Sequence, residues 1–225
     1  MRSDSVFSMS SLQAYLSLTV LCGIALALSI QPSLRIAAVH ASDLSHLPSL
    51  FHLVFVFLFG LFSINRGAVI AANASARILR LKLMFRFLEH IACGLLLLLP
   101  YFVYSRALLP AKIAGIFILV LYVAVSSLFF CLVSFRLEQR GDHRKRGAFL
   151  LRYGLYATFC LVPLAVGMSH RSLSVILSVS PIGLATRVIG GASAIELFVG
   201  FLVPSSGILW LLNGLRRINR RHLAI

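Results

Sequence analysis

Charged residues are scarce in this chain, and acids are scarcest of all. Only 12% of its 225 residues are charged, with six Asp and Glu against 21 Lys and Arg, while 60% are hydrophobic. A soluble domain has about a quarter of its residues charged and nearer half of them apolar. Because so much apolar surface exceeds what a soluble core can bury, the composition excludes a soluble domain and predicts an integral membrane protein.

Several motifs of catalysis and metal binding are also missing. The cysteines each lie in an apolar run, and no two share a C-x-x-C spacing: Cys22, Cys93, Cys131 and Cys160. This pattern argues against a zinc site or a disulfide framework. No phosphate-binding loop of the form G-x-x-x-x-G-K-[S/T] occurs, so any ATP hydrolysis would belong to a separate chain. We therefore expect no cofactor, no metal and no catalytic residue here.

Six apolar stretches are candidates for membrane-spanning helices. Such a helix needs about 20 mostly apolar residues. The charge-free gaps predict spans at approximately 12–30, 48–65, 86–105, 113–135, 149–168 and 194–215. The first stretch could instead be a signal peptide cleaved near Val39-His40-Ala41. We favour a retained span because the apolar run is long and the candidate cleavage site lies well beyond it.

The segment 172–186 is apolar but too short to cross a membrane. It lies between Arg171 and Arg187, contains several serines, and is broken by Pro181 and Gly183. It is typical of a re-entrant or interfacial helical hairpin. The sequence thus predicts an all-α, polytopic helical membrane protein, a single transmembrane domain over residues 1–225. We expect six transmembrane helices, with the hairpin before the last.

The basic residues predict the orientation of these spans. With six spans, five of the 21 Lys and Arg fall outside and the other 16 inside; the outer five are Arg35, Arg106, Lys112, Arg171 and Arg187. Cytoplasmic loops carry such an excess. We therefore expect a multi-pass protein of the plasma (inner) membrane with both termini cytoplasmic. The net charge of +15 comes from basic residues that crowd the ends of the apolar runs. The expected partner is therefore the lipid bilayer, and we expect no nucleic acid.

The stretch 66–86 between the second and third spans is strongly basic and has no acid; its charges are Arg66, Arg77, Arg80, Lys82 and Arg86. At about 100° per residue, Arg77 and Arg80 share one helix face, whereas Lys82 and Arg86 lie nearly opposite. We expect a short loop helix up to about Arg80, a bend, and then the third span. Arg66, Arg77 and Arg80 are candidate contacts to a soluble partner, and Lys82 and Arg86 candidate membrane anchors.

Three ionisable residues fall inside or at the ends of spans, namely Glu89, His90 and Glu196. An ionisable residue within the membrane is a functional candidate by default, and these three could serve as acid and base in an enzyme acting on lipid. The alternative that we favour places both acids at interfaces. Glu89 would then pair with Arg86, and Glu196 with Arg187.

The whole organisation is similar to a known family. Six spans, a basic loop after the second, a basic loop at 136–146, and the sequence LSVSPIGL at Leu177–Leu184 before the last span resemble the membrane subunits of ABC-2-type exporters. The resemblance implies a permease subunit that works with a separate cytoplasmic ATP-binding subunit, as half of a homo- or heterodimer. It places the ATPase contact in the loop with Arg66, Arg77 and Arg80. The alternative is a non-transporting membrane scaffold or assembly subunit.

Overall fold

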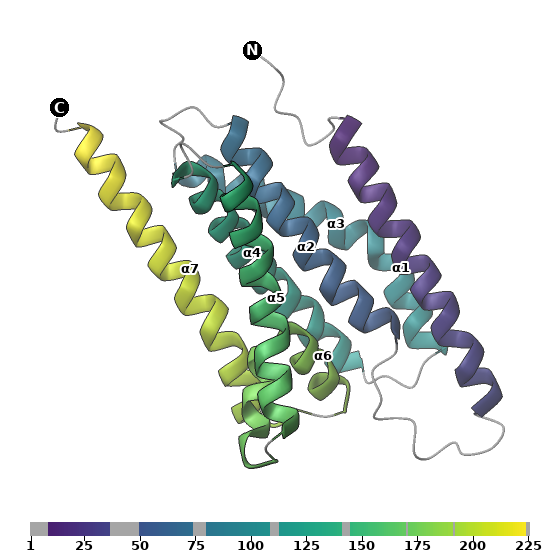
Figure 1. The fold of residues 1–225 in the computed structure, drawn as a ribbon. Helices are drawn as coiled ribbons and strands as arrows, with labels where there is room; N and C mark the ends of the chain where they lie inside the picture. The colour runs from purple at the N-terminus through teal and green to yellow at the C-terminus, as the bar shows by residue number, and fades with distance from the viewer. Residues whose placement is uncertain are drawn as a thin grey trace.

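The computed structural model describes residues 9–36, 50–73, 80–108, 113–140, 145–169, 171–190 and 192–223, and all elements in these ranges are helical (Figure 1). The long helices are α1 (Met9–Ile36), α2 (Leu50–Asn73), α3 (Arg80–Leu108), α4 (Ile113–Arg140), α5 (Lys145–Ser169) and α7 (Ala194–Leu223). Two short elements lie between α5 and α7, the 3₁₀ helix η1 (Arg171–Val179) and the helix α6 (Pro181–Gly190).

Five of these helices are long and apolar enough to cross a membrane. Their candidate spans are Phe51–Ala72, Leu81–Tyr104, Ile113–Gln139, Phe149–Val166 and Ala194–Gly214. In α1 the described apolar stretch, Gln13–Leu28, is shorter. The prediction of an all-α polytopic helical membrane protein is confirmed. The sixth span, and the placement of η1 and α6 in a membrane, stay predictions.

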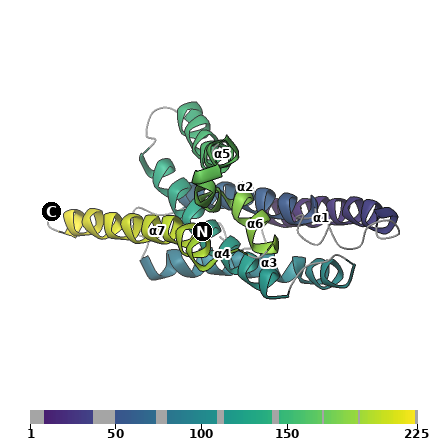
Figure 2. The same ribbon diagram turned by 90° about the horizontal axis from the view of Figure 1, so that it is seen from below.

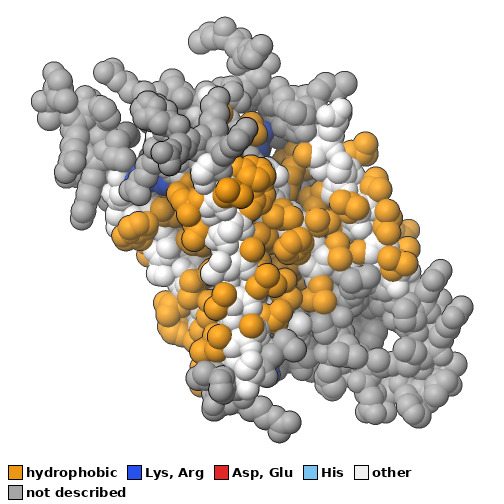
Figure 3. All heavy atoms as spheres, viewed as in Figure 1, with side chains coloured by type: hydrophobic (Ala, Val, Ile, Leu, Met, Phe, Trp, Pro, Cys, Tyr) orange, Lys and Arg blue, Asp and Glu red, His pale blue; other side chains and the backbone are white. Residues whose placement is uncertain are grey.

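The surface supports the same conclusion. Large apolar side chains project outward from the bundle, among them Phe117, Leu150 and Trp210, each at least 70% exposed. On the face drawn in Figure 3, described apolar side chains cover the middle, and Lys and Arg are visible only towards the two ends. A protein in water rarely exposes so large an apolar area. This surface suits the hydrocarbon of a bilayer.

Helix α4 is the centre of the bundle, because it packs against α2, α3, α5, α6 and α7. Half of the residues in the spans of α2 and α4 are buried, against 11% in the span of α5. Seen along the bundle, α7, α2 and α1 form a row with α3 on one side and α5 on the other (Figure 2). Helix α5 is therefore the most peripheral of the five spans.

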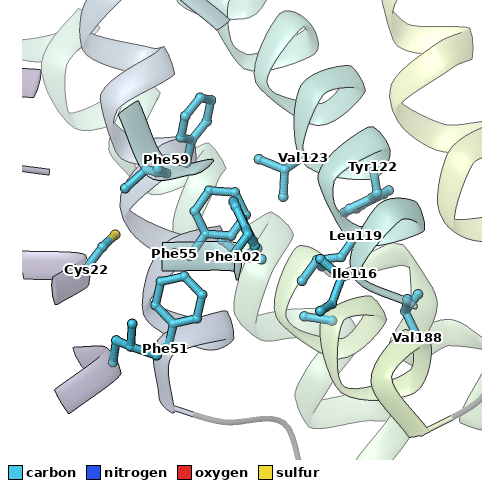
Figure 4. Close-up of a cluster of buried hydrophobic side chains, with 14 of the residues drawn as sticks. Cys22, Phe51, Phe55, Phe59, Phe102, Ile116, Leu119, Tyr122, Val123 and Val188 are labelled. Carbon is cyan, nitrogen blue, oxygen red and sulfur yellow. The ribbon is translucent and has the colours of Figure 1, made fainter. Parts of the chain in front are cut away.

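Aromatic side chains fill the core between α2, α3 and α4. Phe51, Phe55 and Phe59 recur every four residues on α2, so they share one face and are fully buried. The rings of Phe55 and Phe102 meet edge to face with their centroids 4.8 Å apart, and Tyr122 of α4 lies on the far side of this cluster (Figure 4). This packing fixes α3 and α4 against α2.

A close backbone contact joins α2 to α4. A Cβ atom at Gly67 would overlap the carbonyl oxygen of Cys131, so only glycine permits this approach. One turn earlier, the Cys131 thiol donates a hydrogen bond to the Ser63 carbonyl oxygen at 3.2 Å. Small residues at helix contacts are common in membranes because lipid supplies no hydrophobic drive for association and packing must replace it.

The contact with α4 also explains where α2 ends. The sequence analysis ended the second span at residue 65 and expected a separate loop helix, but α2 continues without a break through Arg66 to Asn73. Ile70 is buried in a cluster with Leu83 of α3 and Leu132 of α4. Apolar packing therefore extends about one turn beyond Arg66, and the helix continues to Asn73.

The joint between η1 and α6 is built around Ser180. Its hydroxyl donates to the Cys160 carbonyl oxygen of α5 at 2.6 Å and accepts from the Gly183 backbone N–H at 3.4 Å. Ser180 thus caps α6, and Pro181 occupies the first helical position, where its missing N–H costs nothing. Pro163 of α5 lies three residues after Cys160 and interrupts the hydrogen bonds of that helix.

The α2–α4 contact can be tested with two glycines. Replacing Gly67 with alanine forces the two backbones apart, and we expect a loss of about 1–3 kcal/mol in the free energy of unfolding, the usual cost of overpacking. Gly154 of α5 is the matched control, since nothing lies within 4 Å of a Cβ added there. Gly154→Ala should be neutral or slightly stabilising. Thermal unfolding in one detergent measures both, and equal melting temperatures would refute the close contact.

Candidate functional site

The basic candidates gather at one end of the bundle. We call it the basic end, where α2, α4 and α7 end and α3 and α5 begin. The start of α1 lies there too (Figure 1). Arg66, Lys82, Arg86, Arg136 and Arg152 have described side chains in these terminal turns. Figure 3 shows Lys and Arg side chains at this end.

Arg66 lies within helix α2 and not in a loop. Its side chain is half-buried, and it is close enough for its charge to act on His90 of α3 and Tyr15 of α1.

The other basic candidates are placed only in part. Arg77 lies outside the described residues, and Arg80 opens α3 with a side chain that is not described. Lys82 is exposed, and Arg86, one turn further along α3, is half-buried. Exposed Leu81 and Phe85 surround these two cations. An apolar surface with a cation on a long stem is the arrangement that snorkelling at a membrane boundary requires.

His90 is the one intramembrane candidate that is fully enclosed. The Tyr15 hydroxyl lies 2.9 Å from the His90 Nδ1 atom and donates to the His90 carbonyl oxygen at 3.3 Å. The Phe62 ring packs over the imidazole at a centroid distance of 4.7 Å. Glu89 is exposed, so the adjacent residues do not act together. The Tyr15–His90 pair links α1 to α3, and its burial keeps a substrate from reaching the imidazole.

Glu196 has a structural role at the other end of the bundle. Its carboxylate accepts hydrogen bonds from the Ser193 backbone N–H at 2.8 Å and the Ser193 hydroxyl at 3.1 Å, and the Ser193 hydroxyl accepts from the Glu196 N–H at 3.3 Å. This is a capping box that starts α7. Arg187 of α6 lies 3.4 Å from the same carboxylate, so the expected ion pair is present. The three ionisable candidates are thus not brought together.

Sequence analysis missed the polar contacts that hold α5. Arg152 of α5 forms an ion pair with Glu138 of α4 at 3.0 Å. The Tyr153 hydroxyl donates to the side-chain oxygen of Asn65 on α2. The Glu138–Arg152 pair could have been predicted from the sequence, because acids are scarce in this chain and an acid at a span boundary needs a cationic partner. Within the described ranges, no three His, Cys, Asp or Glu residues meet as metal ligands do.

Arg136 is a further buried cation at the basic end. Only 7% of this residue is exposed. Its guanidinium lies directly over Gly214 of α7, where an added Cβ would approach the Nη2 atom to 2.5 Å. Glycine at 214 therefore gives the Arg136 side chain its place between α4 and α7.

Comparison with known proteins gives no relative. No family model matches the chain, and neither a curated protein nor a solved structure matches it. The fold and the surface define the class as a polytopic helical membrane protein.

The capping role of Glu196 predicts a specific pattern of tolerance. Glutamine can also close a capping box, so Glu196→Gln should cost less than about 1 kcal/mol in stability and leave function intact. Glu196→Ala removes both cap and ion pair and should cost about 1–2 kcal/mol. Chemical unfolding of the two variants measures this difference. If Glu196→Gln instead abolishes function at unchanged stability, Glu196 is an acid–base residue and not a cap.

Proposed function

We propose that this chain is the membrane-spanning permease subunit of an ATP-driven exporter and works with a separate cytoplasmic ATPase. The observation that carries the proposal is the order of elements. Five long helices are followed by the short pair η1 and α6, and then by the last long helix. The ABC-2-type membrane subunits that the sequence resembles have the same order, with short outer helices between spans five and six.

The positions of the helix ends support the same proposal. The start of α1 and the end of α7 lie at one end of the bundle, as an even number of crossings requires (Figure 1). In the proposed orientation the chain lies in the plasma (inner) membrane with its basic end on the cytoplasmic side, in line with the positive-inside rule. The η1–α6 pair then lies at the outer face.

The segment between α2 and α3 is the proposed contact with the ATPase. The helix ends that flank it, the end of α2 and the start of α3, lie at the basic end. Within the proposal, Arg77 and Arg80 contact the partner, and Lys82 and Arg86 hold the start of α3 at the lipid boundary. Arg66 lies within α2 with a half-buried side chain, and it stays a candidate contact in this proposal.

One such subunit would form half of a transporter. In this proposal it pairs with a second copy or a related membrane subunit, and alternating access takes place across that interface. Energy comes from the partner, because the chain itself carries no phosphate-binding loop. The competing function, a non-transporting scaffold, would not depend on an ATPase.

Charge reversal separates the two halves of the basic stretch. Arg77→Glu with Arg80→Glu should weaken ATPase binding by more than about tenfold, because like charges at an interface cost several kcal/mol. Lys82→Glu with Arg86→Glu is the matched control with the same change in charge. It should leave partner binding nearly unchanged and lower the yield of inserted protein. Pull-down and membrane fractionation measure the two effects, and equal losses of ATPase binding would contradict the division.

Co-purification tests the proposal itself. The full chain, solubilised in mild detergent, should bring down an ATP-binding subunit at a stoichiometric ratio. If no such subunit is recovered and the cellular function survives deletion of every candidate ATPase, the permease proposal fails and the scaffold explanation takes its place.

A further inference from the structure

A pocket of about 120 Å³ is lined by residues of α2, α4 and α5. Of these three helices, α5 stands apart from the row that α7, α2 and α1 form (Figure 2). Four aromatic side chains line it, namely Phe129 and Phe130 of α4 and Tyr156 and Phe159 of α5. Arg152 and Ser134 also line it. The pocket is thus largely apolar, with one cation and two residues that carry a hydroxyl, Ser134 and Tyr156, of which the Tyr156 hydroxyl already donates to the Phe57 carbonyl oxygen.

The polar groups are ordered along α4 and α5. On α4, Glu138, Ser134 and Phe130 follow one another at four-residue intervals, about 6 Å apart along the helix axis. Glu138 is nearest the basic end, where it pairs with Arg152. The Glu138 side chain is 28% exposed and that of Arg152 is 11% exposed. From the surface inward, the order is therefore a carboxylate, a guanidinium, a hydroxyl and an aromatic slot.

The buried hydroxyl of Ser134 favours a ligand with a hydrogen-bond acceptor. Ser134 is fully buried, and its Oγ atom has no hydrogen-bond partner among the described residues. Leaving a buried hydroxyl unpaired costs about 1–3 kcal/mol. A ligand that enters the apolar slot and brings an acceptor to the depth of Ser134 would recover this cost.

We propose that this pocket binds one phospholipid with an ammonium head group, of the phosphatidylethanolamine type, from the leaflet at the basic end. An acyl chain occupies the aromatic slot, an ester carbonyl accepts from the Ser134 hydroxyl, and the phosphate accepts from Arg152. The head-group ammonium lies beside Glu138. The proposal holds whether or not the chain is a permease.

Charge complementarity selects this lipid over others. A guanidinium has five N–H donors in a planar fork, so Arg152 can hold Glu138 and a phosphate oxygen together. An anionic lipid such as phosphatidylglycerol would offer its phosphate to Arg152 but would bring no cation to Glu138. A zwitterionic head group places its two charges in the same order as the pair in the protein, with the phosphate deeper and the ammonium nearer water.

The position of α5 gives lipid acyl chains a route to the pocket. The span of α5 is 11% buried, so this helix lies in the lipid phase along most of its length. Lipid tails therefore surround the helix that forms one wall of the pocket. Leu155, another lining residue, is 46% exposed and belongs to that outer surface.

Native mass spectrometry of the full chain tests the site directly. The protein is stripped of lipid in detergent and offered dioleoyl phosphatidylethanolamine, dioleoyl phosphatidylglycerol or dioleoylglycerol. We expect one bound molecule, with phosphatidylethanolamine retained best and dioleoylglycerol worst. Dioleoylglycerol retained as well as phosphatidylethanolamine, or phosphatidylglycerol retained better, would overturn the proposal.

Variants assign each part of the lipid to a side chain. Arg152→Gln should reduce retention of phosphatidylethanolamine about tenfold, the usual effect of a lost charged hydrogen bond. Arg187→Gln is its control, because Arg187 is also paired with a glutamate but lies at the other end. Glu138→Gln should remove the preference for phosphatidylethanolamine over phosphatidylglycerol. If Glu138→Gln keeps that preference, the assignment of the ammonium is wrong.

Two milder substitutions keep the test decisive if Arg152→Gln does not fold. Val133→Phe fills the slot and should abolish retention, whereas Val162→Phe on the exposed side of α5 should not. Ser134→Ala should reduce retention about fivefold. Ser127→Ala is its control, since Ser127 is an equally buried serine of α4 whose hydroxyl has no hydrogen-bond partner among the described residues. Equal retention by either variant and its control would overturn the site.

Discussion

The contact between Gly67 of α2 and the Cys131 carbonyl of α4 is the constraint on which the rest of the bundle depends. Helix α4 packs against five other elements, so its distance from α2 determines where the others can lie. The same stretch of α2 brings Ile70 onto α3 and α4. In lipid, where apolar surface alone does not drive helices together, such close packing is the main source of specificity.

Polar groups act in this bundle as links between helices. Tyr15–His90 joins α1 to α3, Glu138–Arg152 joins α4 to α5, and Ser180–Cys160 joins α6 to α5. A polar group left alone in hydrocarbon is costly, so in a membrane protein such groups are found where a neighbouring helix can satisfy them. Most of the ionisable residues that look catalytic in the sequence are explained by this requirement.

Sequence patterns predicted the local structure well and the contacts between helices poorly. The apolar runs predicted the long helices, whereas the capping box S-A-I-E at Ser193–Glu196 is present in the sequence but was not predicted. The course of α2 past Arg66 was not predicted, because a run of basic residues resembles a loop unless its packing against α4 is known. The Tyr15–His90 pair joins residues 75 positions apart, so no local sequence pattern predicts it.

The arrangement of α5 shows how such distant contacts create a site that the sequence hides. At one end Ser180 binds the Cys160 carbonyl beside the break at Pro163, and at the other Arg152 and Tyr153 bind Glu138 and Asn65. Between these two attachments the Tyr156 hydroxyl donates to the Phe57 carbonyl oxygen of α2, and the Tyr156 ring packs edge to face on Phe130 of α4. The same aromatic rings form walls of the pocket. Because atoms that line an apolar void lose dispersion contacts, an acyl chain in the proposed lipid site would restore them.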